Sequence, residues 1–169
     1  MYLLASVTFL GALLFSERKF NMMKHYVCGF MFTKELDKVY LIRKNRPLWQ
    51  AGRLNGIGGS IESFDKTPYE AMAREFLEEA GVVTQPYSWI HFCSYYGENK
   101  SYCVKMFYNI DQTGLLDIKT QTDEEIILVP VSFVLNQHNS IIYNLKWLIP
   151  LAIDKSLNHK ENGEITIYE

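Results

Sequence analysis

One helix is marked at both of its ends more sharply than any other segment of this chain. Thr67 is a good N-cap, Pro68 stands where a missing N–H is tolerated, and Glu70 follows three residues after the cap to complete a capping box. Gly81 supplies the glycine with which helices commonly end. These signals predict a helix over residues 68–80 and fix which side chains share each of its faces.

The faces of this helix separate apolar from acidic side chains. Glu75, Glu78 and Glu79 lie together on one side at 100° per residue. The apolar residues share the opposite side, which we expect to face the core: Tyr69, Ala73, Phe76, Leu77 and Ala80. Like charges at these spacings destabilise a helix by roughly 0.2–0.5 kcal/mol per pair, and Arg74 offsets only part of this. The glutamates are therefore either an ordinary solvated face or a carboxylate cluster that holds a cation.

The loop before the helix favours the cation. Residues 44–62 carry five glycines or prolines around Trp49, which is a composition typical of loops. Gly58 and Gly59 allow the backbone to approach the helix closely. A backbone carbonyl beside three carboxylates is an all-oxygen shell suited to Mg²⁺ or Mn²⁺, ions that serve phosphate chemistry.

The rest of the chain predicts one mixed sheet with helices. Runs of apolar, β-branched and aromatic residues predict strands. These lie at residues 26–32, 39–42, 57–61, 88–96, 101–109 and 126–131, with a last short strand in the tail ENGEITIYE. A second helix is expected over residues 140–154, with Ile141, Leu145, Leu148 and Ile149 on one stripe, and Pro150 must kink or divide it. This order predicts an α+β fold in which helices sandwich a mixed β-sheet.

The charge and the cysteine spacing argue against nucleic-acid and membrane binding, disulfide bonds and a zinc site. The net charge of −2 gives no general attraction to nucleic-acid polymers or anionic membranes, so a phosphorylated small molecule needs a local device such as a metal. Cys28, Cys93 and Cys103 lack CxxC spacing, which favours buried thiols in a reducing, cytoplasmic compartment over disulfides or zinc. The four histidines are scattered without metal-ligand spacing.

An apolar extension precedes the expected domain. The first fifteen residues carry no charge, yet they lack a basic n-region and are short for a membrane span of about 20 residues. Three interpretations of residues 1–22 stay open: a start codon called too early, with Met22 or Met23 as the true start, a weak anchor or signal-like segment, or an extra element packed on the domain. We expect the folded domain to span residues 23–169.

The segment GGSIESFDKTPYEAMAREFLEEAGV resembles the signature of the Nudix hydrolases: Gly, five residues, Glu, seven residues, then Arg-Glu-apolar-any-Glu-Glu-any-Gly-apolar. Its second half matches at every defined position from Arg74 through Val82. The first half departs, because five residues after Gly59 reach Asp65 and eight residues, not seven, then precede Arg74. Either Asp65 replaces the signature glutamate with a one-residue insertion, or Lys66 stands where a carboxylate belongs.

The resemblance implies an α/β/α sandwich and a Mg²⁺-dependent pyrophosphohydrolase, with Mn²⁺ as an alternative ion. Carried over by position, it implies metal ligation by Glu75, Glu78 and Glu79 with the Gly59 carbonyl, and an orienting salt bridge from Arg74. Family members often add a carboxylate from a late loop as base or ligand. Asp123, Glu124 and Glu125 are the candidates here, and we favour Glu124 beside Glu75, Glu78 and Arg74 as a catalytic residue.

The stretch AGRLNGIGG resembles the branch of the family that hydrolyses (d)NTPs, including oxidised purine nucleotides such as 8-oxo-dGTP. Asn55 matches an asparagine that contacts the base in that branch, and Gly58 belongs to the same segment. Trp49 and Trp147 are candidates for base stacking, and Arg46 and Arg53 for phosphate contacts. The paired acids of some oxidised-purine enzymes correspond to Tyr143 and Asn144.

We therefore expect a small nucleotide substrate, most simply a (d)NTP cleaved to (d)NMP and diphosphate, and neither long nucleic acid nor firm membrane association. ADP-ribose, a dinucleotide or a capped RNA end are alternative substrates. A Nudix module that binds nucleotides without catalysis is the alternative of another class. The sequence leaves the oligomeric state open.

Overall fold

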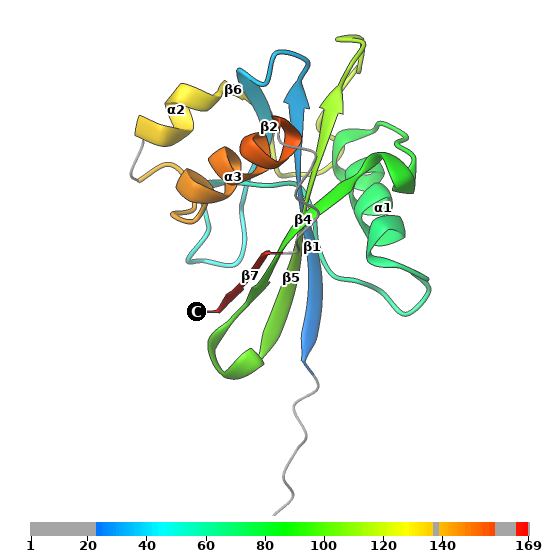
Figure 1. The fold of residues 1–169 in the computed structure, drawn as a ribbon, viewed down its shortest axis with the longest axis vertical. Coiled ribbons are helices and arrows are strands. Elements are labelled where there is room, and N and C mark those ends of the chain that lie inside the picture. The colour runs from blue at the N-terminus through cyan, green and yellow to red at the C-terminus, as the bar shows by residue number, and fades with distance from the viewer. Residues whose placement is uncertain (1–22, 137–138, 158–164, 169) are drawn as a thin grey trace, which may run out of the picture.

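The computed structural model describes residues 23–136, 139–157 and 165–168 (Figure 1). Within these ranges seven strands form one sheet in the order β3-β2-β1-β5-β4-β7, with β6 paired to β2. The strands are β1 (Lys24–Thr33), β2 (Lys38–Arg43), β3 (Leu54–Asn55), β4 (Ile90–Tyr96), β5 (Tyr102–Asp111), β6 (Ile126–Pro130) and β7 (Ile165–Tyr168). The helices are α1 (Pro68–Ala80), α2 (Val131–Asn136) and α3 (Leu145–Leu157), with short 3₁₀ turns η1 (Pro86–Ser88) and η2 (Glu98–Lys100). Since β1 is parallel to β5 and antiparallel to β2, the sheet is mixed, and the predicted α+β fold is confirmed.

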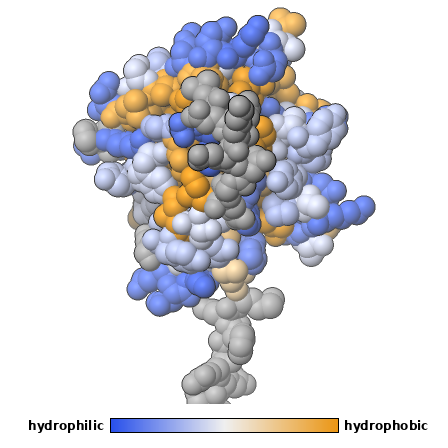
Figure 2. Space-filling model, viewed as in Figure 1, coloured by the Kyte–Doolittle hydropathy of each residue, from blue (hydrophilic) through white to orange (hydrophobic). Residues whose placement is uncertain are grey.

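Helices cover both faces of the sheet. Figure 1 shows α1 on one side of the central strands, with α2 and α3 on the other. The apolar run of β1 serves both layers, because alternate side chains of a strand point to opposite faces. Val27 and Met31 pack with α1, whereas Phe30 and Phe32 pack with α3. In Figure 2 the hydrophobic residues gather where α2 and α3 lie, and hydrophilic residues border them.

Thr67 and Gly81 cap α1 as the sequence predicts, but the predicted capping box forms only in its Thr67 half. The Thr67 side chain accepts the Glu70 N–H at 3.2 Å. The Glu70 carboxylate reaches one residue further than a capping box requires and accepts the Lys66 N–H at 2.8 Å. Gly81 adopts φ 71° and its N–H donates to the Leu77 carbonyl, which ends the helix. The register of α1 is therefore fixed by local contacts.

The buried face of α1 differs from the predicted one. Phe76 and Ala80 are buried as expected, but Tyr69 and Leu77 are 39% and 43% exposed. Ala71 and Met72 are buried in their place. The helix is rotated so that part of its acidic side, at Glu75 and Glu79, lies against the glycine loop.

The C-terminal elements differ from the prediction in detail. The second helix begins at Leu145 rather than at residue 140, because Ile141 instead forms a β-bridge with Leu54. Pro150 lies inside α3 and does not divide it, and the stripe predicted to be apolar is buried in the core. The helix α2 was not predicted, because six residues directly after a strand show no helical period. The predicted final strand is confirmed as β7, which pairs with β4.

The expectations for residues 1–22 fall outside the described ranges. None of the helices that the structure describes is long and apolar enough to cross a membrane. All three cysteines are buried with free thiols, as predicted.

Candidate functional site

The glycine loop and α1 meet where the sequence predicts a cation site. The Gly58 N–H donates to Glu79 Oε2 at 3.1 Å. A Cβ on Gly59 would stand 2.6 Å from Glu75 Oε2, and one on Gly58 would stand 2.2 Å from the Val27 carbonyl oxygen. Only glycines allow this approach of backbone to carboxylate. The Gly59 carbonyl accepts the Val27 N–H at 2.9 Å, so one of its two lone pairs remains for another partner.

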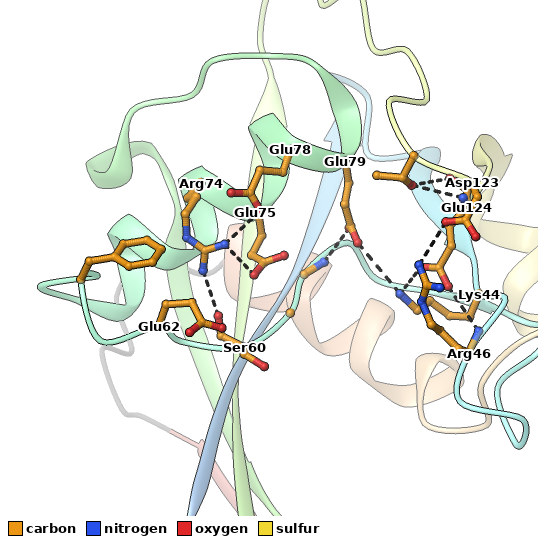
Figure 3. Close-up of a pocket in the computed structure, with 14 residues that line it drawn as sticks. Lys44, Arg46, Ser60, Glu62, Arg74, Glu75, Glu78, Glu79, Asp123 and Glu124 are labelled. Carbon is orange, nitrogen blue, oxygen red and sulfur yellow. Dashed lines mark hydrogen bonds and ion pairs between the residues drawn. The ribbon is translucent and has the colours of Figure 1, made fainter.

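Arg74 organises the outer part of the acidic face (Figure 3). Its Nη1 donates to Glu75 Oε1 at 2.8 Å and to Glu78 Oε2 at 3.0 Å. Its Nη2 donates to the Ser60 carbonyl at 2.9 Å, which ties the helix to the loop. The predicted orienting role of Arg74 therefore has a concrete geometry, in which one guanidinium fixes two of the three signature glutamates.

Asp65 completes the Arg74 network at the point where the sequence departs from the signature. Its carboxylate accepts from Arg74 Nε at 3.1 Å and from Arg74 Nη2 at 2.9 Å, in a two-bond pairing. The Asp65 side chain is only 4% exposed. The hydrogen bonds from Arg74 hold the pKa of Asp65 below its usual value. This geometry favours the insertion with Asp65 as the substitute for the signature glutamate.

Lys44 is a largely buried basic residue between α1 and the late loop, and the sequence reasoning missed it. It directly follows β2, and its ammonium contacts Glu124 Oε2 and lies 4.0 Å from Glu79 Oε1. The side chains of these three residues are 16%, 6% and 12% exposed, in that order. The only available signal was its place at the end of a strand, because its partner Glu124 lies far along the chain.

The three candidate acids of the late loop take different positions. Glu124 is buried, and its Oε1 accepts the Asn45 N–H at 2.6 Å and the Arg46 N–H at 3.4 Å. Asp123 is more exposed and pairs with Arg46 at 3.2 Å, while Glu125 pairs with Arg43. Of the three, Glu124 is thus the one that faces α1 from inside the site.

Many of these groups line one cavity of about 500 Å³, which we call the acidic pocket. In Figure 3 the glutamates of α1 stand on one side, and Lys44, Arg46, Asp123 and Glu124 on the other. The described lining is as follows: Lys44, Arg46, Gly58, Gly59, Ser60, Glu62, Phe64, Arg74, Glu75, Glu78, Glu79, Thr122, Asp123 and Glu124. Six of these side chains are acidic and three are basic, so the pocket carries an excess of negative charge when all are ionised.

Burial and charge shift the pKa values of the inner carboxylates. Burial raises the pKa of Glu79 to about 7, and the nearby charges of Glu75 and Glu124 add to the rise. Burial likewise raises the pKa of Glu75. For Glu124, the hydrogen bonds from Lys44 and from backbone N–H groups outweigh burial and lower the pKa. The charged carboxylate form is therefore disfavoured at Glu75 and Glu79, whereas hydrogen bonds stabilise it at Glu124.

A second cavity of about 460 Å³ adjoins the first, and we call it the aromatic pocket. It is lined by four aromatic side chains from separate segments: Tyr26, Trp49, Tyr95 and Tyr102. The buried Asn144 Oδ1 belongs to this lining and has no hydrogen-bond partner among the described residues. The two pockets share Lys44, Arg46, Gly58 and Gly59. A ligand can therefore extend from the carboxylates into a mainly apolar cavity.

The predicted substrate residues divide between this pocket and other places. Trp49 is 63% exposed and lines the aromatic pocket together with Asn55. The Asn55 amide donates to Gln50 Oε1 at 3.1 Å and accepts the Gly56 N–H at 2.8 Å, so it is held by its own loop. Trp147 packs against Tyr95 at the border of the core, outside the described lining of either pocket. Arg53 is exposed and also stands outside both linings.

A comparison with protein families decides the classification. The model of the NUDIX domain matches residues 23–142, which is most of the chain. The chain belongs to the Nudix family. A Nudix domain indicates a pyrophosphohydrolase, and the signature helix and glycine loop lie inside the matched range. Among curated protein sequences, none matches this Nudix chain significantly.

Solved structures share the Nudix fold at low sequence identity. The NUDIX domain of Shewanella oneidensis NrtR complexed with ADP ribose is 16% identical, with a TM-score of 0.66 over 79% of this chain and 88% of that chain. A NUDIX hydrolase from Nitrosomonas europaea is 19% identical, with a TM-score of 0.60 over 87% and 80%. A MutT structure from work on Aliivibrio salmonicida and Vibrio cholerae is 16% identical, with a TM-score of 0.59 over 78% and 96%. At these identities the likeness shows the fold alone.

The acidic pocket of this Nudix domain fits a divalent ion by its donor chemistry. Its described lining offers carboxylate and carbonyl oxygens and neither thiol nor imidazole, which suits Mg²⁺ or Mn²⁺. Among the described residues, however, no three acidic, histidine or cysteine side chains already converge on one point. The contacts give the reason, since Arg74 holds Glu75 and Glu78 while Lys44 and the Gly58 N–H hold Glu79.

Proposed function

We propose that this Nudix protein is a Mg²⁺-dependent pyrophosphohydrolase that cleaves a nucleoside triphosphate to the monophosphate and diphosphate. The observation that carries the proposal is the junction of the acidic and aromatic pockets at Lys44, Arg46, Gly58 and Gly59. A nucleotide has the same two parts, a polyanion and a flat aromatic base. The shared residues stand where these parts of the substrate join.

The chain's own residues supply binding and orientation. Glu75, Glu78, Glu79 and the Gly59 carbonyl would hold the metal, and Arg74 orients the first two of these carboxylates. When bound, the metal would neutralise diphosphate oxygens and make water a better nucleophile. Burial raises the pKa values of Glu75 and Glu79, so their charged forms are costly. A bound metal would offset this cost by stabilising the two carboxylates in their charged forms.

The aromatic pocket would receive the nucleoside. Trp49 and the tyrosines provide surfaces for stacking, and Asn55 lies in the same lining. The unpartnered Asn144 Oδ1 is a buried acceptor that a base N–H group would satisfy. An oxidised purine such as 8-oxo-dGTP is one substrate with suitable N–H donors, and we include it among the nucleotides to be tested.

Three buried free thiols agree with our proposal of a cytoplasmic location.

A hydrolysis screen tests the proposal directly. The purified protein with Mg²⁺ is incubated with each (d)NTP, 8-oxo-dGTP, ADP-ribose, a dinucleotide and a cap analogue, and the nucleotide products are separated and quantified by ion-exchange chromatography. For the triphosphates, the phosphate released is also measured with and without added inorganic pyrophosphatase. We expect release from triphosphates that depends on pyrophosphatase, because diphosphate is the primary product. Direct release of single phosphates would contradict the proposed bond.

The comparisons supply two alternatives for the same screen. One solved neighbour is a NUDIX domain complexed with ADP ribose, so turnover of ADP-ribose above all triphosphates would assign that substrate instead. Another neighbour is NrtR complexed with DNA, which makes a binding module without catalysis a relevant alternative. Complete inactivity across the screen, with nucleotide binding retained, would favour that module. Retention of Glu75, Glu78 and Glu79 speaks against it, because a module that only binds has little use for a destabilising acidic cluster.

A further inference from the structure

Lys44 places its ammonium between two carboxylates that are largely shielded from solvent and come from different parts of the chain. Glu79 belongs to α1 and Glu124 to the loop before β6. The Lys44 ammonium contacts Glu124 Oε2 and lies 4.0 Å from Glu79 Oε1. All three side chains are less than one fifth exposed. This is a largely buried bridge in which one cation stands between two carboxylates, and not a surface pair.

The backbone fixes the direction in which both carboxylates point. Glu124 Oε1 is held by the N–H groups of Asn45 and Arg46, which leaves its Oε2 turned towards Lys44. Glu79 Oε2 accepts the Gly58 N–H, and Glu79 Oε1 is the oxygen nearer to Lys44. Two carboxylate oxygens on separate elements thus flank one position. Flanking by anionic oxygens is what a hard divalent ion requires, and here an ammonium already stands in that position.

We propose that Lys44 is a tethered cation that takes the place of one divalent ion between Glu79 and Glu124, and so limits the number of metal ions in the acidic pocket. The inference rests on the proposed function, because it assumes that the pocket binds Mg²⁺. The oxygens of Glu75 and Glu78 that do not accept from Arg74, together with the second lone pair of Glu79 Oε2, would remain for the metal. Since Lys44 also lines the aromatic pocket, its charge stays beside the path of a diphosphate whether or not metal is bound.

Removal of the ammonium should leave a vacant cation position. In Lys44→Met the stem is kept, but Glu79 and Glu124 face each other without a counter-charge. A divalent ion would then gain two oxygen ligands that the wild-type protein gives to Lys44. The variant should therefore bind one additional ion per chain, and its metal-free form should unfold at a lower temperature than the wild type.

The test counts Mn²⁺ ions bound by the full chain, from the loss of the free-ion electron paramagnetic resonance signal during titration. We expect one more Mn²⁺ per chain for Lys44→Met than for the wild type, and the wild-type number for Lys44→Arg. Arg46→Met is the matched control: it removes one positive charge from the same pocket, but Arg46 pairs with the exposed Asp123. An equal rise in Arg46→Met would show a general charge effect and would overturn the proposal, as would an unchanged number in Lys44→Met.

A second variant tests the inference without removing Lys44. Because the ammonium and not a metal occupies the position beside Glu124, Glu124→Gln should bind as many Mn²⁺ ions as the wild type. Loss of one ion in Glu124→Gln would make Glu124 a metal ligand and overturn the proposal even if Lys44→Met failed to fold. Absence of Mn²⁺ binding in the wild type would overturn the proposed function as well, whereas equal binding in wild type and Lys44→Met overturns only the role of Lys44.

Discussion

Asp65 and Lys66 are adjacent where the chain departs from the Nudix signature, and their contacts indicate which of them replaces the signature glutamate. The Asp65 side chain is 4% exposed and pairs through two hydrogen bonds with the Arg74 guanidinium. Lys66 contributes its backbone N–H to the cap of α1 and is exposed. We interpret the extra residue as an insertion in the loop before Thr67, which leaves the helix and its carboxylates in register.

Asp65→Asn should lower the free energy of unfolding by about 1–3 kcal/mol at pH 7, because Arg74 loses a charged, two-bond partner. The pKa of Asp65 is lowered in the folded protein, so its contribution to stability is present above about pH 4 and is lost as the pH falls through the folded pKa. Urea unfolding at pH 7 and at lower pH measures both effects. Lys66→Ala is the control and should change the unfolding free energy by less than about 0.5 kcal/mol. A larger effect at Lys66 than at Asp65 would reverse our interpretation.

Glu78→Gln should reduce turnover by roughly 10²–10⁴-fold, a loss typical for a group that acts in the reaction. Glu78 is 55% exposed and its amide can still accept from Arg74, so the melting temperature should stay close to that of the wild type. Glu62→Gln removes a carboxylate from the lining of the same pocket outside the signature helix and serves as the control. The measurement is steady-state turnover of the best substrate in the screen. Wild-type turnover in Glu78→Gln would refute its role.

The sequence predicted which glutamates share one face of α1, but it did not predict their partners. Glu75, Glu78 and Glu79 could be found because caps and helical spacing are local. Lys44 could not, because its contacts with Glu124 depend on β2 and the late loop meeting in space.

At the scale of elements, α1 and the glycine loop form one unit. The ends of α1 follow from Thr67 and Gly81 alone, which explains why its bounds could be predicted. Its buried face could not, because the sheet and the loop decide which side is covered. The loop has no side chain at Gly58 or Gly59, so the acidic side of α1 can lie close to it.

Gly59→Ala should therefore disturb the site more than the fold. Its Cβ would meet the Glu75 carboxylate at 2.6 Å and push it out of its contact with Arg74. We expect a large loss of turnover and weaker Mn²⁺ binding, with a modest fall in melting temperature. Ser60→Ala changes the neighbouring exposed side chain and should behave like the wild type. Unaltered Mn²⁺ affinity in Gly59→Ala would count against the close packing of loop and helix.

At the scale of the whole molecule, the acidic pocket links stability to pH and metal. The pKa of Glu79 is raised to about 7 in the folded protein, so the folded state binds a proton more tightly than the unfolded state does. The metal-free protein should lose stability as the pH rises from about 4.5 to about 7, by an amount on the order of a few kcal/mol. Melting temperatures in EDTA across this range check the slope, and Glu79→Gln should flatten it. Mg²⁺ should raise the melting temperature more at pH 8 than at pH 5, and an equal rise at both would contradict the linkage.

The sequence predicted most of the strands of the sheet, but not the order in which they pair. Apolar runs gave five of the seven strands and the tail gave β7, yet nothing local indicates that β1 lies between β2 and β5. That order brings the late loop, through β6 on β2, to the glycine loop and α1. The site therefore depends on pairings between distant segments.

The parallel pairing of β1 with β5 also bears on how the molecule folds. The two residues of each β1–β5 pair, from Lys24 with Tyr102 to Thr33 with Asp111, lie roughly 80 positions apart in sequence. The chain must close this long loop before the centre of the sheet exists, whereas α1 can begin to form from its own caps. The signature helix should thus appear early as secondary structure, but its carboxylates acquire their partners only in the slow, cooperative step that joins β1 to β5.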